Sequence, residues 1–169
     1  MRGMSKQKGV GLMEVLVALL VLMIGVMGFI VLQYRAVEAT LEGGARVEAI
    51  NLARDFAERI RVNRGALSTY VADMADPEKQ KVQGKDCAKN FCTVAEMARY
   101  DVWQVAGRAK ELEMAVNLLD CQGNSDARQC IYVAWGDTAP TNGVAGEEGD
   151  CTVGTAYDRA STCLIMEVY

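Results

Sequence analysis

The stretch KGVGLMEVLVALLVLMIGVMGFIVLQ, which runs from Lys8 to Gln33, is apolar apart from Glu14 and its two polar ends. Between Val10 and Leu32 there are 23 residues and a single charge, on Glu14. At about 1.5 Å per residue, a helix of that length spans a hydrocarbon layer of roughly 30 Å. The stretch therefore predicts a membrane-spanning helix. It also raises the question of why a carboxylate, which is costly inside a bilayer, is placed there.

The helical pattern continues beyond the apolar run. Between residues 33 and 63, apolar side chains recur at spacings of three and four with charged residues between them, as in an amphipathic helix. No proline precedes Pro77, so we predict one helix from about residue 11 to about residue 63, half membrane span and half stalk.

Glycines are the weak points of this helix, because each costs about 1 kcal/mol relative to alanine. They are Gly25, Gly28 and the pair Gly43 and Gly44. For Gly25 and Gly28 two explanations stay open: close packing against another membrane helix, or a locally flexible turn.

Residues 68–89 contain a proline, a glycine and many charges, and we predict a loop there. Thr93 and Glu96 then have the spacing of a capping box, in which the Thr93 hydroxyl accepts from the Glu96 amide and the carboxylate reaches back. We expect a second helix to follow as far as about Asn117, with its apolar residues on one face.

Two later segments have the composition of strands. They are CIYVAW, residues 130–135, and TCLIMEVY, residues 162–169, with a Gly-, Asp- and Thr-rich stretch from residue 136 to residue 155 between them. We predict an α+β fold in which the long N-terminal helix packs on a small antiparallel sheet with a second short helix. This arrangement gives each apolar face a partner.

All cysteines lie beyond the predicted membrane span, and their number is even. In an exported domain this pattern indicates disulfides, and the spacing favours local pairs, although sequence alone leaves other connectivities open. The alternative, a zinc cluster, lacks both histidine and a tight C-x-x-C pair. The favoured pairs are Cys87 with Cys92, Cys121 with Cys130, and Cys151 with Cys163.

Charge and composition narrow the classes of function. From Gln33 onward there are 21 acidic and 15 basic residues, a balance that argues against a nucleic-acid-binding surface. The three other cations precede the apolar run, which predicts a cytoplasmic N-terminus and a head on the far side of the membrane. Histidine is absent, which removes the commonest general base and metal ligand, so we expect no catalysis, cofactor or metal.

The N-terminal residues resemble the class III signal of type IV prepilins, in which a peptidase cuts after a glycine and leaves the apolar helix on the mature protein. The matching residues are Gly9, Val10, Leu12 and Glu14, with Glu14 fifth when counted from Val10. Two positions depart from the common form: Val10 stands where phenylalanine is usual, and Gly11 where threonine or serine is usual. The resemblance implies cleavage between Gly9 and Val10 and N-methylation of Val10.

This reading divides the chain into four parts. They are a cleaved leader, residues 1–9; a membrane or filament-core half of the helix, residues 10–32; an amphipathic half, residues 33–63; and a disulfide-containing head, residues 64–169. It also explains Glu14, because cleavage creates an amine at Val10 that a carboxylate of the same or a neighbouring subunit can pair with. A buried pair of this kind disfavours wrongly registered packing more than it adds stability.

The segments EVLVALLVLMIGVMGFIVLQ and INLARDFAERIRVNR extend the resemblance to the PilV family of minor pilins, the type IV pilus modification proteins. It is close over about the first 64 residues and loose beyond them. It implies a minor pilin that acts in priming of pilus assembly, in twitching or in adhesion. The expected partners are prepilin peptidase/N-methyltransferase, other minor and major pilins, and the inner membrane, with the head in the periplasm before assembly into the pilus.

Two rival functions stay open. A minor pseudopilin of a type II secretion system shares the same signal and helix, and the INLARDFAERIRVNR segment is the reason for preferring the pilus. A membrane-tethered periplasmic enzyme is the other alternative, although a thiol oxidoreductase would need the missing C-x-x-C.

Overall fold

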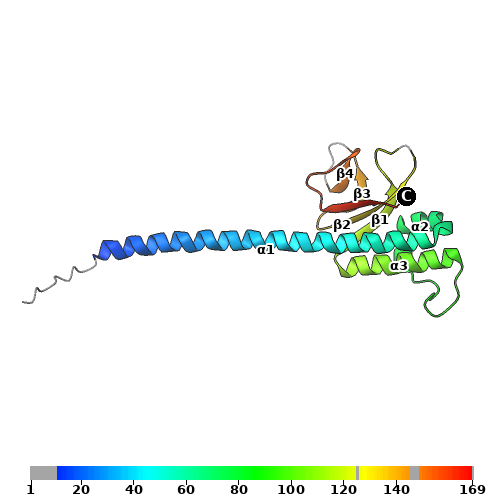
Figure 1. Ribbon diagram of the computed structural model, residues 1–169, viewed down its shortest axis with the longest axis horizontal. Helices are drawn as coiled ribbons and strands as arrows, with labels where there is room; N and C mark the ends of the chain where they lie inside the picture. The colour runs from blue at the N-terminus through cyan, green and yellow to red at the C-terminus, as the bar shows by residue number, and fades with distance from the viewer. Residues whose placement is uncertain (1–10, 125, 145–148, 169) are drawn as a thin grey trace, which may run out of the picture. The chain divides into compact units, whose positions relative to one another are not determined.

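The computed structural model describes residues 11–124, 126–144 and 149–168. The chain divides into two compact units, residues 1–43 and 44–169. The helices are α1 (Leu12–Val62), α2 (Leu67–Met74) and α3 (Val94–Glu111), with the 3-10 turns η1 (Arg64–Ala66) and η2 (Lys79–Lys81). The strands are β1 (Met114–Asp120), β2 (Gln129–Trp135), β3 (Ala139–Gly143), β4 (Asp150–Val153), β5 (Ala156–Tyr157) and β6 (Cys163–Glu167) (Figure 1).

The single long helix predicted from the sequence is confirmed as α1. In the first unit, every described residue of this helix is exposed, including all the large apolar side chains of the predicted membrane span. The second unit begins at Gly44, and in this unit one face of the helix is buried. The residues buried on that face are Ala49, Leu52, Ala53, Phe56, Ala57 and Ile60.

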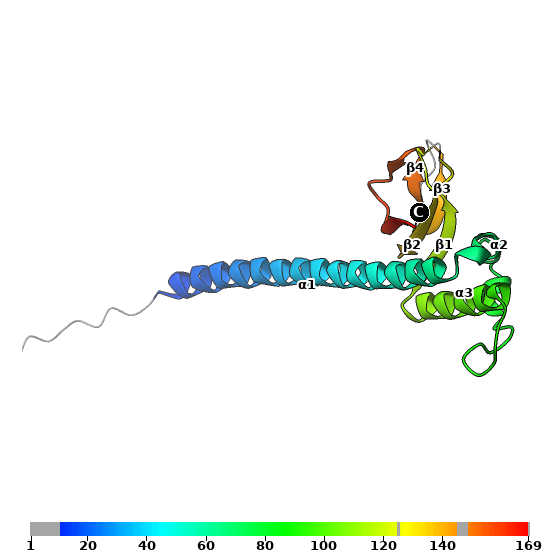
Figure 2. The same cartoon turned by 45° about the vertical axis from the view of Figure 1, so that its right-hand side comes forward.

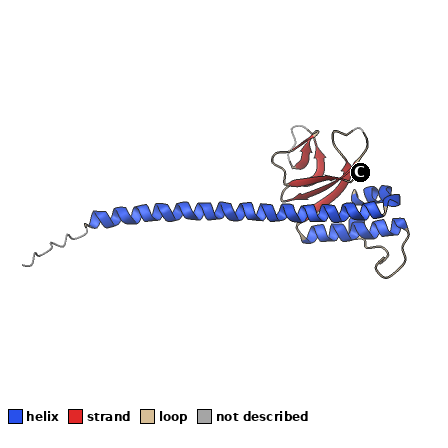
Figure 3. Cartoon of the chain, in the orientation of Figure 1, coloured by secondary structure: helices blue, strands red, loops and turns tan. Residues whose placement is uncertain are grey.

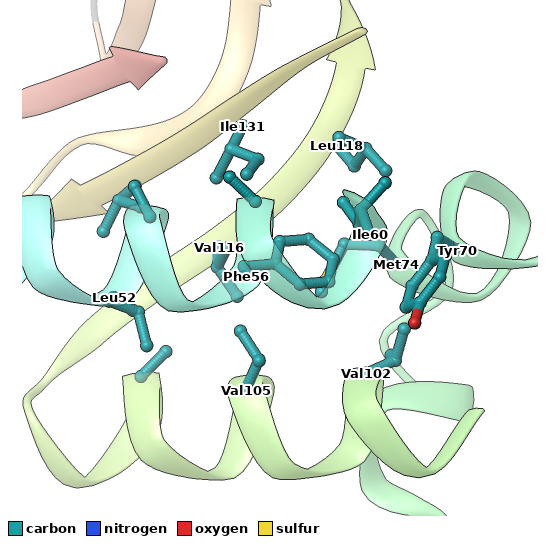
Figure 4. Close-up of a cluster of buried hydrophobic side chains, with 14 of the residues drawn as sticks. Leu52, Phe56, Ile60, Tyr70, Met74, Val102, Val105, Val116, Leu118 and Ile131 are labelled. Atoms are coloured by element: carbon teal, nitrogen blue, oxygen red, sulfur yellow. The ribbon is translucent and has the colours of Figure 1, made fainter. Parts of the chain in front are cut away.

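This face of α1 forms the centre of the head's hydrophobic core. Side chains from α2, α3, β1 and β2 pack against it, so this face of the helix is covered by two helices and a sheet (Figures 1 and 2). Figure 4 shows Phe56 in the middle of this cluster, and its ring meets that of Tyr70 edge to face at 5.8 Å. Other buried members are Val102 and Val105 from α3, Val116 and Leu118 from β1, and Ile131 from β2.

The prediction of a loop over residues 68–89 is wrong in its first part, where the chain forms α2. Tyr70 and Met74, four residues apart, are both buried against the core, and their burial stabilises a helical turn. The polar residues around them made this turn look like a loop in the sequence. The rest of the segment has only the short turn η2.

The second helix begins as predicted and ends earlier than predicted. Thr93 is the N-cap and forms the complete capping box with Glu96. The helix stops at Glu111 because Glu113 adopts a left-handed conformation with φ of 56°. The residues that follow, which were expected to continue the helix to Asn117, form β1, where buried and more exposed positions alternate.

The predicted antiparallel sheet is confirmed, with the strand order β1-β2-β6. A second small sheet, β3-β4-β5, was not predicted, and its β3–β4 pair is parallel (Figure 3). The two backbones approach closely at Gly143, where an added Cβ would lie 2.5 Å from the Thr152 carbonyl oxygen. Glycine is therefore required at this position.

The six cysteines pair locally in the structure. Cys87–Cys92 closes the loop before α3, Cys121–Cys130 joins the end of β1 to β2, and Cys151–Cys163 links β4 of the second sheet to β6 of the first. The Cα atoms of the pairs lie 5.6, 5.0 and 5.5 Å apart. The paired cysteines are 5, 9 and 12 residues apart along the sequence. By loop-closure entropy alone, closing a loop of this length stabilises the head by about 2–3 kcal/mol.

The disulfide pattern can be tested by peptide mapping. Trypsin cuts between the two cysteines of every pair, at Lys89, Arg128 and Arg159, and a protease that cuts after glutamate separates Cys130 from Cys151 at Glu147 and Glu148. In the combined digest each cysteine lies on its own peptide, so each bond holds two peptides together until it is reduced. We expect mass spectrometry of the unreduced digest to find the three local pairs. Linked peptides that join cysteines of different pairs would contradict this arrangement, and the reduced digest is the control.

Candidate functional site

The first candidate site is the start of α1. Glu14 lies in the first turn of the helix, where the Glu14 amide donates to the Gly11 carbonyl oxygen at 2.9 Å. A carboxylate in this turn interacts favourably with the positive end of the helix dipole. No cation among the described residues forms an ion pair with Glu14. Gly9 and Val10, the predicted cleavage and methylation positions, lie outside the described residues.

The residues after Glu14 give this site its setting. The helix is long and apolar enough to cross a membrane, and none of its most apolar stretch is buried. Residues this apolar on every side of a helix require lipid or other helices around them. The Glu14 carboxylate therefore lies at the start of an apolar helix surface that is not stable in contact with water.

Gly25 and Gly28 occur within this apolar surface. The helix is continuous at both positions, and a Cβ added to either would meet no atom within 4 Å. Packing within the described chain thus gives no reason for glycine at these positions. Close approach of a second helix remains one explanation and local flexibility the other.

The second candidate site is a polar cluster inside the head. The Arg59 guanidinium on α1 donates to Asp101 Oδ1 on α3 at 2.7 Å, to Gln104 Oε1 at 2.7 Å and to Asp55 Oδ2 at 3.1 Å. The Tyr70 hydroxyl on α2 donates to the other Asp101 oxygen at 2.6 Å. Asp101 is only 6% exposed, and its two oxygens accept hydrogen bonds from side chains of two different helices. We call Arg59, Tyr70 and Asp101 the helix clamp.

The surroundings of the helix clamp raise the pKa of Arg59 and of Tyr70. Burial alone would lower the pKa of Arg59, but the hydrogen bond to Asp101 and the charges of Asp55 and Asp101 raise that pKa above its ordinary value. Burial, followed by the hydrogen bond to Asp101, raises the pKa of the Tyr70 hydroxyl as well. The arginine thus stays charged and the tyrosine stays protonated, which suits a structural connection between three helices.

Sequence reasoning missed the helix clamp. Its members are 31 and 42 residues apart along the chain, and no local motif connects them. One signal was present: Asp101 stands between Ala98 and Val102 in the apolar stripe of α3, and an acid in such a stripe needs a buried partner.

Two family models match the chain. The prokaryotic N-terminal methylation motif matches residues 4–30, and type IV pilin Tt1218 matches residues 31–103. The first match contains Glu14, and the second contains all three residues of the helix clamp. Together the matches support a pilin-type protein. Comparisons with curated proteins and with solved structures gave no match.

Removing the central acid should weaken the head. Asp101→Ala leaves Arg59 with fewer partners and the Tyr70 hydroxyl without its acceptor, so we expect a loss of about 2–3 kcal/mol in unfolding free energy. The measurement is denaturant unfolding of the full chain in detergent. The control is Glu58→Ala, which removes an exposed ion pair with Arg61 on the same helix and should change stability by less than about 0.5 kcal/mol. Equal stability of the two variants would contradict the role given to Asp101.

Proposed function

We propose that this pilin-type chain is a minor pilin of a type IV pilus, processed by prepilin peptidase and active in priming pilus assembly. The observation that carries the proposal is the N-terminal arrangement. The methylation motif match, the acidic first turn at Glu14 and an apolar helix that continues into a folded head occur in one chain. Each part has a use in a subunit that is first anchored in a membrane and then packed into a filament.

Processing supplies the partner that Glu14 needs. Cleavage between Gly9 and Val10 creates an amine four residues before the carboxylate, and methylation leaves its positive charge in place. In a filament the apolar halves of neighbouring helices pack side by side, so the amine of one subunit can pair with the carboxylate of the next. In surroundings of low polarity, a wrongly registered neighbour would leave both charges unpaired at high cost.

The head supplies the recognition surface. Before assembly it faces the periplasm, where an oxidising environment keeps the disulfides formed. It includes the last turns of α1, because the core and the helix clamp both hold them. Prepilin peptidase/N-methyltransferase, the inner membrane and other pilins are the partners of this proposal, and the role is structural rather than catalytic.

A minor pseudopilin of a type II secretion system would use the same processing and the same helix. The two functions separate in the cell: deletion of a pilus component reduces piliation and twitching, whereas deletion of a secretion component leaves secreted enzymes in the periplasm. We expect the first phenotype.

Intact mass spectrometry of the chain extracted from membranes tests the processing step. We expect a protein that begins at Val10 and carries the added mass of one methyl group. In a strain without the peptidase, the same chain should begin before Gly9. A chain that is cut downstream of Leu32, or is left uncut in the presence of the peptidase, would refute the proposal.

The Glu14→Ala variant tests the assembly step. It should still be cleaved, because the cut lies between Gly9 and Val10, but its amount in sheared pili should fall at least about tenfold, as expected when a buried charge loses its partner. The control is Glu38→Ala, which removes an exposed carboxylate paired with Arg35 on the same helix. Wild-type amounts of the Glu14 variant in pili would rule out the pairing.

A further inference from the structure

The loop that leads into α3 displays an aromatic side chain with no partner in the described chain. Phe91 is 100% exposed, more than any other large apolar residue of the head. It lies between Cys87 and Cys92, which form a disulfide, so it stands on a small covalently closed loop. Figure 3 draws this segment as the extended loop beside the first turn of α3.

Hydrogen bonds fix the closed loop from the inside. The Asp86 carbonyl oxygen accepts from the amides of Lys89 and Asn90 at 3.3 and 3.1 Å, and the Asp86 carboxylate accepts from the amide of Ala88 at 3.1 Å. The chain that follows Cys92 enters the capping box of α3 directly. The loop is therefore ordered before any partner arrives, and little conformational entropy is lost when Phe91 is buried.

Two exposed valines lie at the helix ends next to this loop. Val62 ends α1 and is 88% exposed, and Val94 begins α3 and is 59% exposed. The Asn63 side chain donates to the Val94 carbonyl oxygen at 2.8 Å, which brings the ends of the two helices together. We call Phe91, Val62 and Val94 the Phe91 patch.

The charges near the patch indicate what kind of partner it fits. Lys85 pairs with Glu96 at 3.3 Å, and Lys89 pairs with Asp86 at 3.2 Å. Arg61, next to Val62, likewise pairs with Glu58 at 2.7 Å. Because each of these three cations has an acidic partner within the head, they offer little uncompensated positive charge to an anionic lipid surface. An apolar pocket of another protein is the better match, since burial of an aromatic residue there needs no charge complement.

We infer that Phe91 inserts into an apolar pocket on the head of a neighbouring pilin in the assembled complex. This inference rests on the proposed function, because it needs a neighbour held in the same filament. The Phe91 patch is small for a stable complex of free proteins, which usually buries about 1,200–2,000 Å². Between subunits whose helices are already packed together, the high effective concentration makes such a contact effective.

Photocrosslinking tests this contact directly. The photoreactive amino acid benzoylphenylalanine replaces Phe91 in the full chain, and in a matched control it replaces Val144, which is 60% exposed elsewhere on the head. After irradiation of sheared filaments, we expect the Phe91 position to form an adduct with another pilin, identified by mass spectrometry, and the Val144 position to form none.

Each other outcome is decisive. If the chain is present in filaments but the Phe91 position gives no pilin adduct, only lipid adducts, or the same adducts as Val144, the inference is wrong. If the unsubstituted chain is missing from filaments altogether, the proposed function itself fails, and the contact with it.

Side-chain variants measure how much the contact contributes. Phe91→Ala removes a fully exposed ring, so thermal unfolding of the chain should be unchanged, whereas its incorporation into filaments should fall about tenfold. Val144→Ala should be incorporated normally. Changing both Cys87 and Cys92 to serine keeps the Phe91 side chain but removes the disulfide that closes the loop. For this variant we expect an intermediate loss of incorporation. Normal incorporation of Phe91→Ala would overturn the inference.

Discussion

The described N-terminal half of α1 must be removed from water, and this requirement limits the surroundings in which the chain is stable. From Leu12 to Leu32 every side chain is exposed in the isolated chain, and a helix that is apolar on all sides has no stable position in solution. A bilayer satisfies the requirement for a single chain, and in the proposed function the apolar halves of neighbouring subunits satisfy it in a filament. Under that proposal the same surface serves two environments, and Glu14 matters most in the second.

The helix changes character where the head begins. Up to Gly44 all its described residues are exposed, and from Ala49 to Ile60 one face is enclosed by α2, α3 and the sheet. This face comes from the INLARDFAERIRVNR segment, which suggested a pilus protein on sequence grounds. Its structural task is to hold the head, and a pseudopilin needs the same connection. The segment therefore supports the pilin architecture more strongly than it separates the two filament systems.

Local patterns were enough to predict much of this fold. The period of the apolar residues defined α1, the Thr93 and Glu96 spacing defined the start of α3, and β-rich composition located β2 and β6. The errors arose where tertiary contacts decide. Met114 and Leu118 are four residues apart, which also fits a helix, and only the strand pairing with β2 makes them alternate in burial with their neighbours. The partnership of Arg59 with Asp101 spans 42 residues, and no local pattern could show it.

Disulfides stabilise the sheets and one loop of the head, whereas noncovalent contacts hold α1 in it. All three bonds lie after residue 86, where they close a loop and join the strands of the two sheets, and none of them reaches α1. Apart from the backbone that continues from Val62 into η1, α1 is therefore held in the head by noncovalent contacts, namely the core around Phe56 and the helix clamp. A force along α1 would reach the head through the backbone at the end of the helix and through these contacts. A charge-assisted bond from Arg59 to a buried acid suits that position, because it resists sliding along the helix axis, a motion that apolar packing opposes less specifically.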